Sequence, residues 1–188
     1  GIITGVVDKE NIITGERIKI GDTLVGIPSS GLHTNGYSLA RKIFFEVGGY
    51  GVEDKIPDLQ KSVGMTLLEP HINYTNHVLS VLKNGTIVNG IAHITGGGLI
   101  ENIPRVLPNG CSASIHKDSW PSLDVFVAMQ SIGNIEEEEM YRSFNMGIGM
   151  VFIVNDEDVS IISNILKDLS PVYEIGKVVA GDGQVTIR

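Results

Sequence analysis

A run of three glycines at residues 96–98 places the tightest constraint on the fold of this chain. It follows an apolar segment over residues 86–94, which predicts a strand, and no regular element can continue through it unchanged. Pro104 lies six residues beyond the run. Because proline clashes with the preceding helical turn, the helix that follows the glycines is predicted to be one short turn over residues 99–103.

A loop without side chains suits close approach by an anion. Glycine tolerates positive φ and leaves the peptide N–H groups unshielded, and the helical turn adds free N–H groups of its own. The flanking side chains supply an imidazole, a hydroxyl, an amide and a guanidinium, the polar groups that a phosphate ester uses. The alternative is a tight turn that only joins two packed elements. We interpret the segment as a phosphate-contacting loop, with Thr95, Gly96, Gly97 and Gly98 as candidate ligand contacts and His93, Asn102 and Arg105 beside them.

The segment Ser29-Ser-Gly-Leu-His-Thr-Asn-Gly-Tyr37 repeats this arrangement, because it lies between a predicted strand and a predicted helix. Ser30, Gly31 and Asn35 are its candidate substrate contacts, although Asn35 is equally explained as a helix cap. The imidazoles of His33 and His93 can act as cations for phosphate or as proton carriers, so both are candidate catalytic residues. Each is alternatively an ordinary hydrogen-bonded histidine, but their matching contexts favour one shared site.

Three further histidines, His71, His77 and His116, lack such a glycine-rich context and are interpreted as structural. Asn145 precedes a predicted buried strand and is a candidate third wall of the site, with a simple turn as the alternative. The acidic run over residues 136–139 predicts a solvated helix face, since adjacent carboxylates on a helix point in different directions. No metal ligands are predicted.

The order of apolar segments predicts an α+β (mixed α/β) fold with a mixed, largely antiparallel sheet and covering helices. Helices are expected over residues 39–47, 72–83 and 136–144 and after residue 156, with Leu79 and Leu82 of the second helix facing inward. Strands are expected over residues 1–7, 23–27, 86–94, 113–115, 150–154, 172–179 and 185–187.

The composition of the chain limits the kinds of partner that it is expected to bind. The chain has 188 residues and a formal net charge of −8 without a basic run, so nucleic acid and anionic membranes are not expected partners. Cys111 is the only cysteine, which excludes an internal disulfide and indicates a cytoplasmic location. No apolar run approaches the roughly 20 residues that cross a bilayer. The common ATP and NAD signatures are also missing from the sequence.

Three stretches of the sequence resemble the phosphoribosylformylglycinamidine cyclo-ligase family, also called AIR synthetase. They are GDTLVGIPSSGLHTNGYSLARK at residues 21–42, HITGGGLIENIPRVLP at residues 93–108 and EEMYRSFNMGIG at residues 138–149. The resemblance covers the C-terminal domain of that family over residues 10–188. Residues 1–9 resemble the strand that joins this domain to an N-terminal, ATP-binding and dimer-forming half, which lies outside the chain.

The resemblance implies ATP-dependent ring closure of formylglycinamidine ribonucleotide to aminoimidazole ribonucleotide in purine biosynthesis. ATP and Mg²⁺ are then the cofactors, held mainly by the other half, and the full-length protein is a homodimer. An isolated fragment is expected to be inactive. The alternatives are a non-catalytic ligand-binding or assembly module of the same fold, or a domain of a related ATP-dependent synthetase such as formylglycinamidine ribonucleotide synthetase.

One segment departs from the family. Where its members commonly have Pro-Thr-Arg/Lys-Ile-Tyr-Val-Lys, this chain has Pro70-His-Ile-Asn-Tyr-Thr-Asn76, which keeps Pro70 and Tyr74 and lacks both basic residues.

Overall fold

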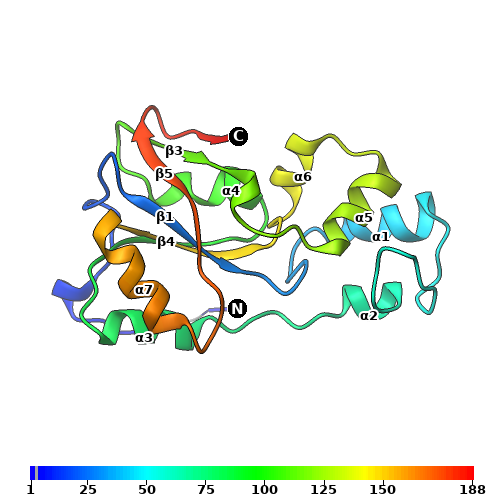
Figure 1. Cartoon of the computed structure of the whole chain (residues 1–188), viewed down its shortest axis with the longest axis horizontal. Helices are drawn as coiled ribbons and strands as arrows, with labels where there is room; N and C mark the ends of the chain where they lie inside the picture. Colours follow the sequence, from blue (N-terminus) through cyan, green and yellow to red (C-terminus); the bar gives the residue numbers. More distant parts are fainter. Residues whose placement is uncertain (3) are drawn as a thin grey trace.

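The computed structural model describes residues 1–2 and 4–188, which form a six-stranded sheet with helices on both faces and at one end (Figure 1). The strand order is β2-β4-β1-β5-β3-β6, and every neighbouring pair is antiparallel except β3 and β6. This confirms the predicted mixed, largely antiparallel sheet. The strands are β1 (Thr23–Pro28), β2 (Val88–His93), β3 (Cys111–Ile115), β4 (Ile148–Val154), β5 (Tyr173–Ala180) and β6 (Val185–Ile187).

Strand β4 lies between β2 and β1, is buried along its whole length and supplies side chains to both faces of the sheet. Ile148, Val151 and Ile153 join the core on one face, beneath α4 (Gly98–Asn102). Phe152 and Val154 join the core on the other face, which α3 (Thr75–Lys83) and α7 (Val159–Leu166) cover. Each large apolar side chain buried in this way stabilises the fold by about 1.5–3 kcal/mol.

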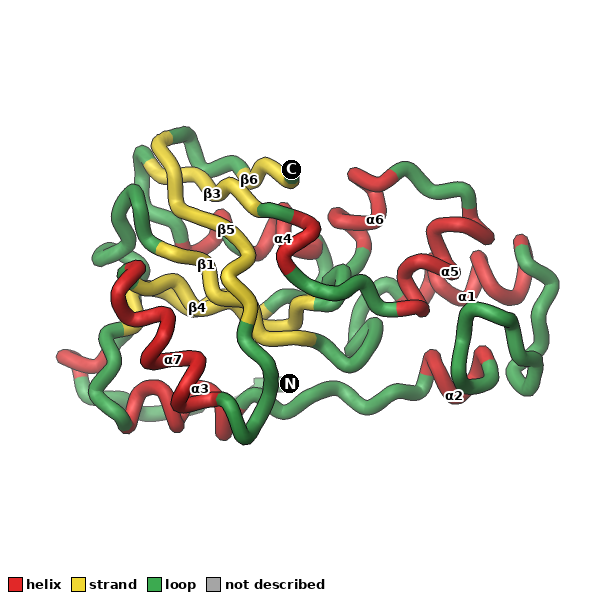
Figure 2. Tube along the Cα trace, in the orientation of Figure 1, coloured by secondary structure: helices red, strands yellow, loops and turns green. Residues whose placement is uncertain are grey.

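A third core lies at one end of the sheet, where helices pack on helices. It contains Phe44, Phe126 and Phe144 and is enclosed by α1 (Tyr37–Arg41), α2 (Val63–Leu67), α5 (Asp124–Gly133) and α6 (Glu137–Ser143). Helix α1 continues as a turn of π-helix over Lys42–Val47. Figure 2 shows a long loop that runs from α2 back along the sheet to α3. None of the helices in the described part of the chain is long and apolar enough to span a bilayer.

Two sequence predictions about these elements are wrong. The predicted strand over residues 1–7 does not form in residues 1–2 and 4–7, which are exposed and unpaired, and residue 3 lies outside the described residues. A strand needs a hydrogen-bonded neighbour, and apolar composition alone does not supply one. Leu79 and Leu82 of α3 are exposed, whereas His77 and Val81 are buried, because α3 packs on the sheet through the adjacent face of the helix.

The three glycines of residues 96–98 have three different environments. A side chain at Gly96 would meet nothing within 4 Å. Gly97 has φ +95°, and a Cβ there would lie 2.6 Å from Cβ of Glu101. Gly98 is buried with φ +57°, and a Cβ there would lie 2.0 Å from the carbonyl oxygen of Tyr141. Gly98 therefore lets α4 approach the backbone of α6, while Gly96 alone leaves its loop open to the outside.

This difference predicts that two alanine substitutions differ strongly in their effect on stability. Gly98→Ala should lower the free energy of unfolding by about 2–4 kcal/mol, because it combines a positive φ with a clash against backbone. Gly96→Ala should change it by less than about 0.5 kcal/mol. Urea unfolding followed by circular dichroism measures both. Equal destabilisation by the two substitutions would contradict these environments.

Candidate active site

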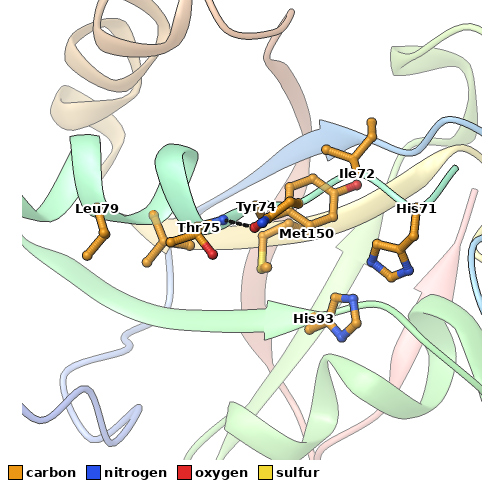
Figure 3. A pocket seen from close by; sticks show the side chains of 9 residues that line it. His71, Ile72, Tyr74, Thr75, Leu79, His93 and Met150 are labelled. Atoms are coloured by element: carbon orange, nitrogen blue, oxygen red, sulfur yellow. Dashed lines mark hydrogen bonds between the residues drawn. The ribbon is translucent and has the colours of Figure 1, made fainter. Parts of the chain in front are cut away.

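A cleft of about 600 Å³ lies where β2 ends and the loop before α3 crosses β4. Its lining is largely apolar, with His71 and His93 at one end (Figure 3). The other lining residues are Ile72, Asn73, Tyr74, Thr75, Val78, Leu79 and Met150. The glycine loop follows His93 directly, so the candidate phosphate loop begins at the histidine end of this cleft.

His33 lies in the loop that follows β1 and has φ 60°, which is uncommon for a residue other than glycine. Its side chain is 3% exposed. The backbone N–H of Ser30 donates to Nε2 of His33 at 3.1 Å. The neutral ring therefore carries its proton on Nδ1, and Nδ1 has no hydrogen-bond partner among the described residues.

His71 lies between the two candidate catalytic histidines, although the sequence gives it no glycine-rich context. Its ring stacks on that of His33 with centroids 4.0 Å apart and planes at 22°. Its centroid lies 5.5 Å from that of His93. The structure therefore joins His33 and His93 through a third imidazole, and we call these three residues the histidine cluster. His116 is exposed and lies in no such cluster.

Tyr74 lies next to the histidine cluster. Its hydroxyl donates to the carbonyl oxygen of Pro28 at 2.7 Å, and its ring centroid lies 6.0 Å from that of His33. Gly149 of β4 makes room for both side chains, because a Cβ there would lie 2.0 Å from the Tyr74 hydroxyl and 2.9 Å from His33 Cε1. In the sequence, only the two closely spaced glycines, Gly147 and Gly149, indicate that other residues approach the backbone of this segment closely.

Asn145 holds the loop that contains His33. It is fully buried, and its Oδ1 accepts from the Ser29 hydroxyl at 2.8 Å and from the Gly147 N–H at 2.9 Å. Its Nδ2 donates to the carbonyls of Gly31 at 2.8 Å and Leu32 at 3.2 Å. These four bonds use the whole hydrogen-bonding capacity of the amide. Asn145 therefore fixes the shape of the loop from beneath.

Asn102 fixes the shape of the glycine loop in the same way. Its Nδ2 lies within hydrogen-bonding distance of the carbonyls of Thr95 at 3.3 Å, Gly96 at 3.1 Å and Gly98 at 2.8 Å. The N–H groups of Thr95, Gly96 and Gly97 donate to no acceptor that the structure describes. The loop thus directs carbonyls to a buried amide and leaves three donors for a ligand.

The other candidate contacts lie around these two loops. The Ser30 hydroxyl donates to the Pro70 carbonyl at 2.5 Å, which ties the His33 loop to the segment carrying His71. Ser30 and Gly31 also line a separate cleft of about 270 Å³. Nδ2 of Asn35 donates to the Ser143 carbonyl at 3.3 Å, and its Oδ1 is buried without a partner among the described residues.

Burial disfavours the charged forms of His33 and His93 in the free protein. Burial first, and then the neighbouring imidazoles of His71 and His93, lower the pKa of His33 to about 4. Burial, and then His71, also lower the pKa of His93. Desolvation disfavours a charged ring, and two adjacent charged rings repel each other. Near neutral pH the buried ring of His33 is therefore neutral.

The donors present suit a phosphate monoester better than a nucleoside triphosphate with its metal. In the described part of the chain, no three His, Cys, Asp or Glu side chains are arranged to hold a metal ion. The residues lining the cleft also include no Lys or Arg among those the structure describes. The described residues of this cleft therefore do not provide a site for ATP with Mg²⁺.

Residues 19–188 match the family described as AIR synthase related protein, C-terminal domain. The chain belongs to this family. It is 50% identical over 185 residues to the phosphoribosylformylglycinamidine cyclo-ligase of Geotalea uraniireducens, which covers 96% of this chain and 53% of that protein. The protein of the same name from Caldanaerobacter subterraneus is 48% identical over 188 residues, covering 100% of this chain and 55% of its own length. The chain thus spans about half the length of these curated relatives.

Solved structures with low sequence identity share the fold. Thiamine-monophosphate kinase from Stenotrophomonas maltophilia superposes with a TM-score of 0.62 at 14% identity, covering 96% of this chain and 54% of that chain. Hydrogenase maturation protein HypE, solved in complex with ATP, superposes with a TM-score of 0.59 at 16% identity. The match covers 92% of this chain and 49% of that chain. The fold therefore occurs in proteins that bind ATP.

The lowered pKa of His33 predicts a loss of stability on mild acidification. The unfolded chain takes up a proton at His33 near pH 6.5, whereas the folded chain does so only near pH 4. Above about pH 6.5, His33 does not lower the free energy of unfolding. Between pH 7 and pH 5, proton uptake by His33 in the unfolded chain lowers that free energy by about 2 kcal/mol. His33→Asn should remove most of this slope, because asparagine tolerates positive φ and does not titrate.

Urea unfolding at pH 7, 6 and 5 measures the slope, and His116→Gln is the matched control because His116 is an exposed histidine outside the cluster. The control should retain the pH slope of the original chain. An unchanged slope in His33→Asn would show that His33 is not the group responsible.

Proposed function

We propose that this chain is the C-terminal, substrate-side domain of a phosphoribosylformylglycinamidine cyclo-ligase, with residues 1–9 joining it to an N-terminal half. The observation that carries the proposal is the 50% identity, over 96% of the chain, to a relative of that name. The enzyme would close the imidazole ring of formylglycinamidine ribonucleotide to give aminoimidazole ribonucleotide. The formyl oxygen is phosphorylated, a nitrogen attacks the formyl carbon, and phosphate leaves.

In this proposal the two loops bind the substrate. The N–H groups of Thr95, Gly96 and Gly97 bind its phosphate, since free backbone donors in a bare loop suit an anion. Gly98 and Asn145 act by holding the loops in place, which their packing and hydrogen bonds support. Ser30, Gly31 and Asn35 form the remaining substrate-binding wall.

His33 and His93 are the proposed catalytic residues. A neutral imidazole both donates and accepts a proton, so either ring can move a proton during ring closure or stabilise developing charge. The unpartnered Nδ1 of His33 supports a donor role for that atom. His93 is exposed at the cleft mouth and adjoins the phosphate loop, which supports contact with the same ligand.

ATP with Mg²⁺ is the proposed cofactor pair, held mainly outside this chain. The occurrence of ATP in a structural neighbour supports ATP use. A homodimer and a cytoplasmic location complete the proposal. The free, buried Cys111 is consistent with a reducing compartment.

The curated names favour a cyclo-ligase over the other two candidates, a related synthetase and a non-catalytic module. The structure "T. maritima PurL complexed with AMPPCP" shares only the fold with this chain, since it is 15% identical with a TM-score of 0.55. The altered segment Pro70 to Asn76 motivates the non-catalytic module. Activity measurements separate these candidates.

Joining this chain to the part of the Caldanaerobacter relative that it does not cover should give an enzyme that forms aminoimidazole ribonucleotide. The chain alone should form none. Product is measured by colorimetric detection of the aminoimidazole, with the intact Caldanaerobacter protein as the positive control. A folded chimera that binds formylglycinamidine ribonucleotide yet forms no product would favour the non-catalytic module.

Substrate binding by the chain alone should depend on the open face of the glycine loop. Gly96→Val should weaken binding of formylglycinamidine ribonucleotide about tenfold to a hundredfold, because valine shields the free donors without meeting a neighbour. Gly5→Val is the matched control at another open glycine. Isothermal titration calorimetry measures both. Equal affinity of Gly96→Val and the original chain would contradict the phosphate-loop assignment.

A further inference from the structure

The candidate site faces an anion without a fixed positive charge. Neither the cleft lining nor the segment from Pro70 to Asn76 contains Lys or Arg in the part of the chain described here. Backbone N–H groups carry only partial charges, whereas a phosphate monoester carries nearly two full negative charges. Within the described part of this chain, a titratable group beside the cleft can supply positive charge to such a ligand.

The histidine cluster is the titratable group available. His71 stacks on His33 at 4.0 Å and lies 5.5 Å from His93, so one proton on any of these rings raises the cost of a second. The cluster therefore tends to take one proton at a time. A nearby anion favours that proton, since opposite charges within about 6 Å stabilise the charged form.

His71 is placed to receive this proton. Its ring lies at the cleft mouth and is partly exposed, whereas His33 is buried beneath it. Nδ1 of His71 lies 3.5 Å from the Thr34 hydroxyl. A proton on His71 can thus be hydrated and hydrogen-bonded, while a proton on His33 would be enclosed.

We propose that His71 makes the binding of a phosphate monoester proton-linked, so that the ligand and one proton bind to the histidine cluster together. This inference rests on the proposed function. It adds that the affinity of the site for a phosphate monoester depends on pH. His71 acts here as a specificity-determining residue for dianionic phosphate, because its proton is taken up together with the anion.

The other charged and titratable groups around the cluster are not placed to take up this proton. From the segment before α3, Glu69 pairs with Lys61 at 2.5 Å, and Tyr74 donates its hydroxyl to Pro28. From α4, the Glu101 carboxylate lies beside Gly97 and opposes an anion on that loop. The facing residues of β4, Gly149 and Met150, do not titrate.

Isothermal titration calorimetry with formylglycinamidine ribonucleotide, in two buffers of different ionisation enthalpy, counts the protons taken up on binding. Between pH 7 and pH 8.5 the phosphate is already dianionic. Full linkage to one proton weakens binding by up to about tenfold per pH unit. His71→Gln should take up fewer protons and lose most of this dependence, and His116→Gln should behave as the original chain.

Proton NMR of the imidazole Cε1 hydrogens identifies the ring that gains the proton. A downfield shift of the His71 signal on addition of ligand supports the inference. Binding without proton uptake, or an unchanged pH dependence in His71→Gln, overturns it while leaving the proposed function intact. Failure of the folded chain to bind the ribonucleotide at any pH contradicts the ligand of the proposed function itself.

Discussion

The geometry of the candidate site depends on two buried asparagine amides. Asn145 uses four hydrogen bonds to fix the loop that carries His33, and Asn102 reaches three carbonyls of the glycine loop. A buried amide left unpaired costs about 1–3 kcal/mol, so each amide and its carbonyls favour one loop shape. Because the carbonyls face inward, the free N–H groups of the glycine loop remain available to a ligand.

Both loops also meet the end of α6. Asn35 donates to the Ser143 carbonyl, Gly98 lies against the Tyr141 carbonyl, and Asn145 follows two residues after Ser143. This one turn therefore sets the distance between segments that are about 60 residues apart in the sequence. The absence of a side chain at Gly98 permits the contact, so that part of the triple glycine serves packing and only its outer part can serve a ligand.

Much of the sheet could be predicted from apolar runs such as those of β1 and β4, whose central position leaves both faces buried. The two loops could be predicted from their glycine, histidine and asparagine content. Their internal bonds could not, since the sequence reveals that Asn102 and Asn145 are donors and acceptors but not which partners use them. His71 was missed for a similar reason. The loop between α2 and α3 runs along the sheet (Figure 2), and the sequence does not reveal that this path stacks His71 on His33.

Burial of His33 couples stability to binding at this site. Burial, followed by the neighbouring imidazoles of His71 and His93, lowers its pKa to about 4, so the His33 ring stays neutral in the free protein near neutral pH. A fixed cation in the place of His71 would attract anions at every pH, but it would also place a permanent charge against a buried imidazole. Exchangeable protons avoid that cost because the charge appears together with the anion that balances it. The stacked histidines thus reconcile a largely apolar cleft with a charged ligand.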